Sequence, residues 1–98
     1  MSLKVNWTSE SERTFNQNLE YLSKEWDNTV MNHFLDRVDE VIKKIQINPL
    51  LFPLHRVEEQ IHKCVIHERI ILYYKVTDDR IDLLTFWNTY QNPSRLNL

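Results

Sequence analysis

The segment that decides the fold is QIHKCVIHERIILYYKVTDDRIDLLTFW, residues 60–87. It contains three apolar runs, and two polar dipeptides separate them, His67-Glu68 and Asp78-Asp79. Runs rich in β-branched and aromatic residues between turn signals are typical of strands. The middle run, Ile70–Val76, is apolar on both faces, as expected of a central strand. The segment therefore predicts a meander of three strands.

A short strand and a helix are predicted at the start of the chain. Residues 3–7 alternate between apolar and polar side chains, a period of two that indicates a half-buried strand. Ser9 is followed three residues later by Glu12, which is the pattern of a capping box at a helix N-terminus. The apolar stripe of this first helix consists of Phe15, Leu19, Leu22 and Trp26.

A second helix is predicted to follow almost without a linker. Asp27 is a favourable N-cap residue, and Asn48-Pro49 ends the helix because proline disfavours the helical conformation in the residue before it. Its apolar stripe consists of Val30, Phe34, Val38, Val41, Ile42 and Ile45. Residues 48–59 are expected to form a loop that leads into the meander.

Together these elements predict an α+β fold in the order β-α-α-β-β-β. The helical hairpin would pack its apolar faces on a mainly antiparallel sheet, giving a sandwich of two layers. The 98 residues fit one domain, residues 1–98, with one hydrophobic core.

Composition limits the classes of function. The formal net charge is −2 and the isoelectric point is about 6.0, so no strongly basic field would draw the whole molecule to nucleic acid. Glycine is absent, which argues against a glycine-rich phosphate-binding loop. No apolar run approaches the ~18 residues of a membrane span, and no signal peptide opens the chain. A cytoplasmic protein with no membrane partner is expected.

Side chains for metal or covalent chemistry are sparse. His55, His62 and His67 are not arranged with cysteine or carboxylate at the spacing of a metal site. Cys64, the one cysteine, lies in an apolar run, which favours a small buried side chain over a nucleophile. We therefore expect no metal and no cofactor.

Metal-free cleavage of RNA is the chemistry that remains open. In that reaction a 2′-hydroxyl attacks the adjacent phosphate, so the site needs a base, an acid and cations around the developing charge. The candidate catalytic residues are Arg56, Lys63, Tyr90 and Arg95, with Arg69 beside the strands. Each is also an ordinary surface group, and the set is small.

The whole chain resembles the RelE/ParE superfamily of bacterial type II toxins. The likeness lies in the order and spacing of five segments, namely Val5–Thr8, LSKEW at 22–26, IKKIQINPLLFP at 42–53, RIILYYKVTDDRIDLLTFW at 69–87 and QNP at 91–93. The resemblance implies a RelE-like fold and a toxin that a co-expressed antitoxin neutralises. RelE-like members cleave mRNA in the ribosomal A site, whereas ParE-like members poison DNA gyrase and have no known nuclease site.

The sequence departs from the cleaving members at two places. They commonly carry Arg or Lys on the central strands and Arg, His or Tyr near the C-terminus, but residues 70–74 contain no basic residue and residues 88–91 read NTYQ. These departures favour a ParE-like, non-enzymatic toxin that inhibits a cytoplasmic target such as DNA gyrase. The alternatives are a RelE-like mRNA endonuclease acting with the ribosome, and a degenerate member that only binds a partner.

Partner binding is expected to involve aromatic residues. Strand alternation places Phe86 and Trp87 on opposite faces, so one joins the core and the other is partly exposed. Trp87 and Tyr90 are therefore the predicted partner-binding residues. An antitoxin could add a strand to the sheet edge and lay a helix into an apolar groove. Without the antitoxin, the chain is expected to form homo-oligomers or to aggregate.

Overall fold

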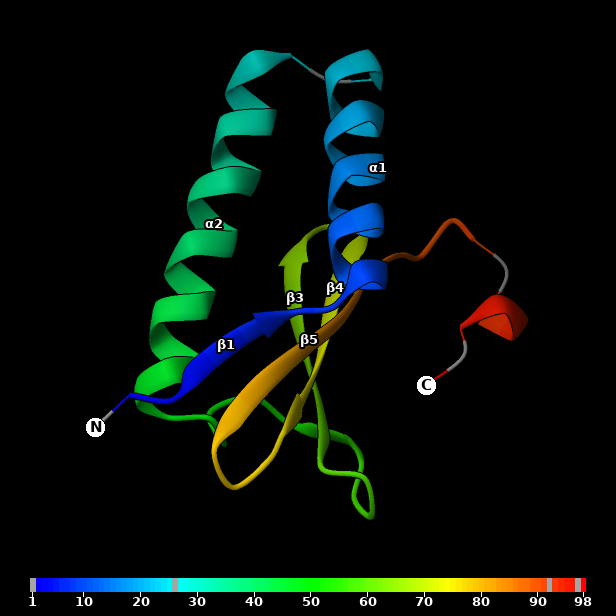
Figure 1. Cartoon of the computed structure of the whole chain (residues 1–98). Helices are drawn as coiled ribbons and strands as arrows, with labels where there is room; N and C mark the ends of the chain where they lie inside the picture. Colours follow the sequence, from blue (N-terminus) through cyan, green and yellow to red (C-terminus); the bar gives the residue numbers. More distant parts are fainter. Residues whose placement is uncertain (1, 26, 92, 97) are drawn as a thin grey trace.

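The structure, a computed structural model, describes residues 2–25, 27–91, 93–96 and 98. Two helices lie on one face of a five-stranded sheet, and the tip of the helical hairpin extends beyond the sheet (Figure 1). The elements in chain order are β1 (Lys4–Trp7), α1 (Ser9–Glu25), α2 (Asn28–Ile47), β2 (Leu54–Arg56), β3 (Ile61–His67), β4 (Ile70–Val76), β5 (Arg80–Asn88) and a short 3₁₀ helix, η1 (Pro93–Arg95). The predicted α+β sandwich of two layers is confirmed.

The sheet has the strand order β1-β5-β4-β3-β2. β1 runs parallel to β5 and the other pairs are antiparallel, so β4 is the central strand, as predicted. Two details of the prediction are wrong. The expected loop 48–59 contains β2, whose three residues are all exposed and so show no apolar alternation. His67 belongs to β3, and the turn that follows is formed by Glu68 and Arg69.

The helix ends show which capping predictions hold. Asp27 caps α2, because its carboxylate accepts a hydrogen bond from Val30 N at 3.1 Å. The predicted Ser9–Glu12 box is wrong by one residue, since Thr8 Oγ1 accepts from Ser11 N at 3.1 Å. Thr8 Oγ1 also donates to Leu83 O at 2.6 Å, which fixes it at the end of β1. The residue that follows the strand therefore also caps the helix.

The main core lies between the helices and the sheet. The predicted stripe of α2 is confirmed, with Phe34, Val38, Val41 and Ile45 buried. In the stripe of α1, Leu22 is buried while Phe15 and Leu19 pack against the core, and Trp26 lies outside the described residues. Aromatic rings from four elements meet here, including Trp7 stacked on Phe86 at 5.6 Å between centroids.

A polar contact attaches α1 to the edge of β5. β1 pairs only with residues 80–83 of β5, so the edge of β5 beyond them has no strand partner. There Thr14 Oγ1 accepts a hydrogen bond from Phe86 N, and Asn18 Nδ2 donates to Phe86 O, both at 2.9 Å. Unsatisfied buried backbone groups are costly, and these two buried side chains remove that cost. We call this pair of contacts the edge clamp.

The edge clamp generates a stability prediction. Asn18→Leu leaves the Phe86 carbonyl without a donor, so the free energy of unfolding should fall by about 1–3 kcal/mol. Urea denaturation measures this change. Asn16→Leu is the matched control, because Asn16 is exposed on the same helix and its replacement should leave the free energy nearly unchanged. Equal stabilities of the two variants would contradict the role of the clamp.

Candidate functional site

The sheet face away from the helices carries a second apolar cluster, which we call the apolar floor. Its buried members are Ile61, Tyr73 and Trp87. As predicted, Phe86 and Trp87 point to opposite faces, Phe86 into the main core and Trp87 into this cluster. Trp87 is only 8% exposed, not partly exposed as expected, because Ile71, Leu84, Leu96 and Leu98 pack against the cluster. We call this side of the sheet the open face.

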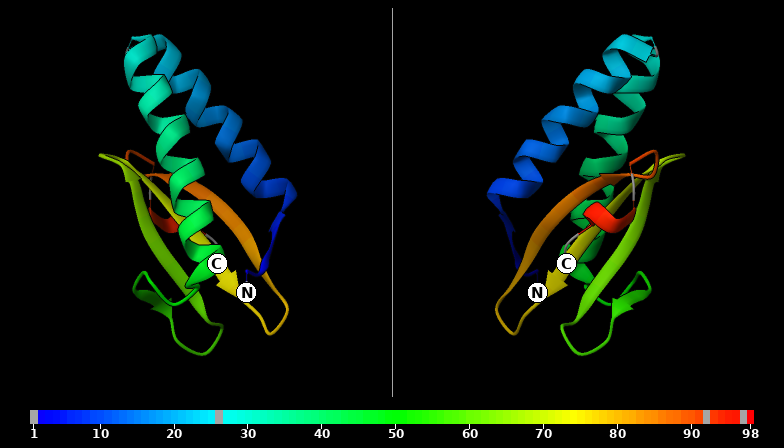
Figure 2. Two further views of the ribbon diagram at one scale, coloured as in Figure 1. Left: turned by 90° about the vertical axis from the view of Figure 1, so that its left-hand side faces the viewer. Right: turned by 90° about the vertical axis from the view of Figure 1, so that its right-hand side faces the viewer.

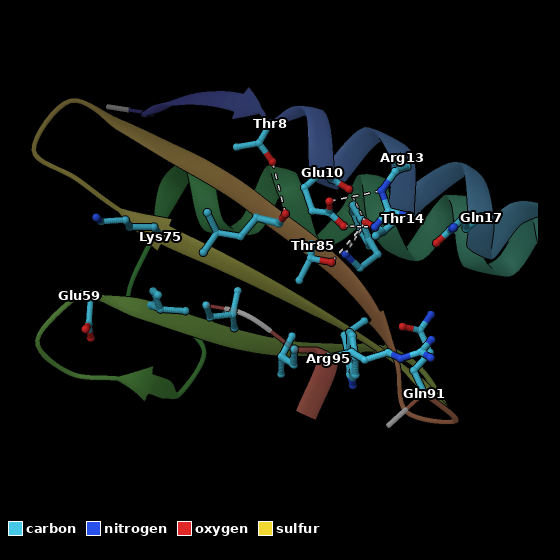
Figure 3. Close-up of a pocket in the computed structure, with 16 residues that line it drawn as sticks. Thr8, Glu10, Arg13, Thr14, Gln17, Glu59, Lys75, Thr85, Gln91 and Arg95 are labelled. Carbon is cyan, nitrogen blue, oxygen red and sulfur yellow. Dashed lines mark hydrogen bonds and ion pairs between the residues drawn. The ribbon is translucent and has the colours of Figure 1, made fainter. Parts of the chain in front are cut away.

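A cavity of about 950 Å³ adjoins the apolar floor (Figure 3). One wall comes from the first half of α1, which the edge clamp holds beside β5, and another comes from the chain end after β5. Its polar lining includes Arg13 and Gln17 of α1, Lys75 of β4, and Gln91 and Arg95 near the C-terminus. Segments far apart in the sequence therefore present cations to one cavity.

Three residues beside the apolar floor form a basic strip on the β2 side of the sheet. These residues are His55, Arg56 and Lys63. The His55 ring meets the Tyr73 ring edge-on, with 4.8 Å between centroids, and Lys63 is the cross-strand neighbour of Tyr73. Partial burial, and then the charges of Lys63 and Arg56, lower the pKa of His55 below its ordinary value. At neutral pH this imidazole is therefore uncharged and able to accept a proton.

Among the described residues, most ion-paired cations lie on the helices, although Arg80 of β5 also pairs with Asp82 at 2.9 Å. On the helices, all five Lys and Arg side chains make ion pairs with carboxylates: Arg13–Glu10, Lys24–Glu20, Arg37–Glu40, Lys43–Asp39 and Lys44–Glu40. Arg56, Lys63, Lys75 and Arg95 make none with any described residue. The cavity also contains the carboxylates of Glu10 and Glu59, so it is not uniformly positive. The positive charge available to an anionic ligand nevertheless lies on the open face.

The four residues proposed from the sequence do not form one cluster. Arg56 and Lys63 lie together in the basic strip, and Arg95 lines the cavity. Tyr90 lies beyond the end of β5, with its ring 4.1 Å from the guanidinium carbon of Arg69. It is 64% exposed and remains accessible to a partner. The structure thus brings together two of the four and separates Tyr90 from them.

Sequence reasoning missed Arg13, His55 and Lys75. Lys75 could have been found, because it lies two residues after Tyr73 on the same strand and so faces the same side. Arg13 reaches the cavity only because the edge clamp sets the position of α1, and His55 reaches Tyr73 only through the unpredicted strand β2. Neither placement has a local signal in the sequence.

Two other reactive side chains are buried on the helix face of β3. Cys64 is 2% exposed, and burial raises the pKa of its thiol to about 11, which confirms the predicted buried side chain. The Nδ1 of His62 donates to Phe52 O at 2.8 Å, since a carbonyl can only accept. Within the described residues, no three His, Cys, Asp or Glu side chains are grouped to hold a metal ion, and no helix could cross a membrane.

Comparison with known proteins gives matches in fold. No family model and no curated protein matches the sequence. A chain of the Escherichia coli DinJ–YafQ toxin–antitoxin complex matches with a TM-score of 0.64 and 11% identity, covering 92% of this chain and 96% of that one. The YoeB dimer from Staphylococcus aureus matches with a TM-score of 0.59 and 15% identity, covering 88% of this chain and 95% of that one. A copper-bound mutant toxin from Helicobacter pylori matches with a TM-score of 0.57 and 21% identity, covering 90% of this chain and 96% of that one.

The chain has the fold of these toxins. The predicted RelE-like sandwich is therefore confirmed as a fold. The expected closeness to ParE is not supported, because the matching structures named above are of YoeB, YafQ and a Helicobacter pylori toxin.

The basic strip generates a prediction about the protonation of His55. Lys63→Ala should raise the pKa of His55 toward its ordinary value, and Arg56→Ala should raise it less, because Lys63 has the larger electrostatic effect on the ring. An NMR titration of the imidazole protons at low salt measures both changes. Lys43→Ala, which removes a cation from α2, should leave this pKa unchanged. An unchanged titration in the Lys63 variant would contradict the arrangement.

Proposed function

We propose that the chain is the toxin of a type II toxin–antitoxin system and that it cleaves RNA on its open face, as RelE-like toxins do. The observation that carries the proposal is the group of unpaired cations around an aromatic floor, on a fold shared with YafQ and YoeB. This reverses the ranking that the sequence favoured. That ranking counted too few cations, because it left out Lys75, which lines the cavity with Arg95, and it did not consider His55 as a base.

The open face offers each group that metal-free RNA cleavage requires. His55 would accept the proton of the 2′-hydroxyl, whose oxygen then bonds to the adjacent phosphorus. Lys63 and Arg56 would balance the charge of the phosphorane. The bond from phosphorus to the 5′-oxygen breaks, and the protonated Lys63 would supply a proton to that oxygen. The products are a 2′,3′-cyclic phosphate and a 5′-hydroxyl, so atoms and charge balance without a metal.

RNA bases would bind through the aromatic residues of the apolar floor. Tyr73 lies between the basic strip and β5, since its cross-strand neighbours are Lys63 and Thr85. Burial raises the pKa of the Tyr73 hydroxyl, so it stays protonated and uncharged. Aromatic side chains stack on any base, and each such contact adds about 1–3 kcal/mol. A net charge of −2 is compatible with RNA binding on the open face, because carboxylates of the helices are paired with lysines of the same helices.

An antitoxin protein is the proposed partner. Matching structures include complexes of the toxins YafQ and YoeB with DinJ and YefM. Here β1 and β2 are the edge strands, and an exposed edge can accept a strand from another chain. Tyr90 and the Arg69 side chain against it are further candidates for this contact. Gyrase inhibition and a non-toxic binding role remain the alternatives.

Substitutions in the basic strip test the proposed reaction. His55→Ala and Lys63→Ala should each lower the cleavage rate by about 10²-fold, the usual contribution of one acid or base. Primer extension on mRNA translated with purified ribosomes reports the cuts. His33→Ala is the matched control, because His33 is an exposed histidine of α2 in the other layer, and it should cleave normally.

Primer extension and a gyrase supercoiling assay together separate the alternatives. Absence of cuts by the wild-type chain, together with inhibition of gyrase supercoiling, would reject RNA cleavage in favour of the ParE-like function. Absence of both activities would favour a protein that only binds its partner.

A further inference from the structure

Exposed apolar side chains gather in one segment of the chain, residues 47–57. This segment runs from the end of α2 through β2, at the end of the molecule away from the tip of the helical hairpin (Figure 1). Among the described residues, eight large apolar side chains are exposed, and five of them lie in this segment: Ile47, Leu50, Leu51, Leu54 and Val57. Single exposed apolar residues are ordinary, but a group of them marks a contact surface. We call these five side chains the β2 surface.

The loop that carries part of this surface is anchored from beneath. His62 Nδ1 donates a hydrogen bond to Phe52 O at 2.8 Å, and Tyr74 Oη donates to Pro49 O at 3.1 Å. The two donating rings are buried and stack on each other, with 5.2 Å between centroids. The two leucines between these carbonyl groups are nevertheless 66% and 46% exposed. The sheet thus holds them in place at the surface, so a partner that binds them has little chain to order.

The charges beside the β2 surface are of both signs and have no partner within the chain. Arg56 ends β2, and Glu58 and Glu59 follow in the turn that leads to β3. All three are exposed, and none makes an ion pair with a described residue. A partner with charge of one sign would leave one of these groups beside a like charge. A second copy of the same surface carries both complements, because a two-fold axis sets residue i of one chain against residue j of the other and j against i.

The surface also includes a free strand edge. β2 is the last strand in the order of the sheet, at the opposite edge from β1 (Figure 2). An exposed edge can pair with the edge of another chain. With only three residues, however, β2 offers few backbone hydrogen bonds, so apolar side chains must supply most of the contact. The anchored leucines on the segment before β2 provide them.

We propose that the chain forms a two-fold dimer through the β2 surface. The leucines of the two copies pack together, and Arg56 of each copy pairs with Glu58 or Glu59 of the other. The dimer does not rest on the proposed function, because a chain that stays monomeric could still cleave RNA. Arg56 also belongs to the basic strip, so under the proposed function dimerisation and RNA binding would compete for its charge.

Replacing one leucine tests the apolar contact. Leu50→Ser should raise the dissociation constant of the dimer at least about tenfold, because each copy loses an apolar side chain from the contact. Sedimentation equilibrium of the full chain measures this constant. Leu35→Ser is the matched control, because Leu35 is an exposed leucine of α2 outside the β2 surface, and it should leave the constant unchanged. Thermal unfolding verifies that both variants are folded. A dimer that Leu50→Ser forms as tightly as wild type would overturn the proposal.

Reversing the charges tests the two-fold arrangement. Arg56→Glu and Glu58→Arg/Glu59→Arg should each weaken the dimer, because like charges then meet across the axis. An equimolar mixture of the two variants should form a mixed dimer about as tight as that of wild type, since each surface again meets the opposite charge. The same sedimentation experiment reports both results. Two variants that stay monomeric when mixed would contradict the paired charges and, with them, the two-fold dimer.

The wild-type chain decides between a second copy and another partner. A chain that remains monomeric up to millimolar concentration rejects the dimer, whatever primer extension shows for RNA cleavage. Hydrogen exchange then identifies the occupant. Protection of residues 47–57 that appears only in a complex with a co-expressed antitoxin would assign the β2 surface to the antitoxin. Protection that rises with the concentration of the chain alone is the result that the dimer predicts.

Discussion

Two side chains of α1 replace a strand at the edge of β5. Thr14 and Asn18 satisfy both backbone groups of Phe86 at the point where β1 no longer pairs. This contact places α1 beside the sheet, so that the apolar sides of both helices cover one face while the polar side of α1 borders the other. Arg13 and Gln17 consequently line the cavity. The cavity and the open face therefore depend on how one helix is attached to one strand.

The distribution of charge follows from the two layers. Along a helix, carboxylates three or four residues away neutralise each cation, and such pairs are local and exposed. On the sheet, Arg80 pairs with Asp82, whereas Arg56, Lys63, Lys75 and Arg95 make no ion pair with any described residue. A chain with a net charge of −2 can thus concentrate positive potential on one face. The net charge alone does not show where the positive potential lies.

Local patterns in the sequence predicted the architecture well. Helical periodicity located both helices, and the doubly apolar run of β4 identified the central strand. The errors occurred where long-range contacts decide the outcome, because Thr8 caps α1 while bonded to Leu83, and the three-residue β2 forms only by pairing with β3. The site was harder to predict for the same reason. Its cations come from five separate elements, α1, β2, β3, β4 and η1, and strand pairing and the edge clamp bring them to one side of the sheet.

The central claim is that RNA binds the open face, and photo-crosslinking tests it most directly. An oligonucleotide carrying 4-thiouridine would be bound to the full chain and irradiated, and the modified peptides identified by mass spectrometry. The account predicts crosslinks in peptides that contain Tyr73, Lys63 or His55. Crosslinks confined to the exposed side of α2 would contradict it. A crosslinking yield no higher than that of an unrelated acidic protein under the same conditions would contradict it as well.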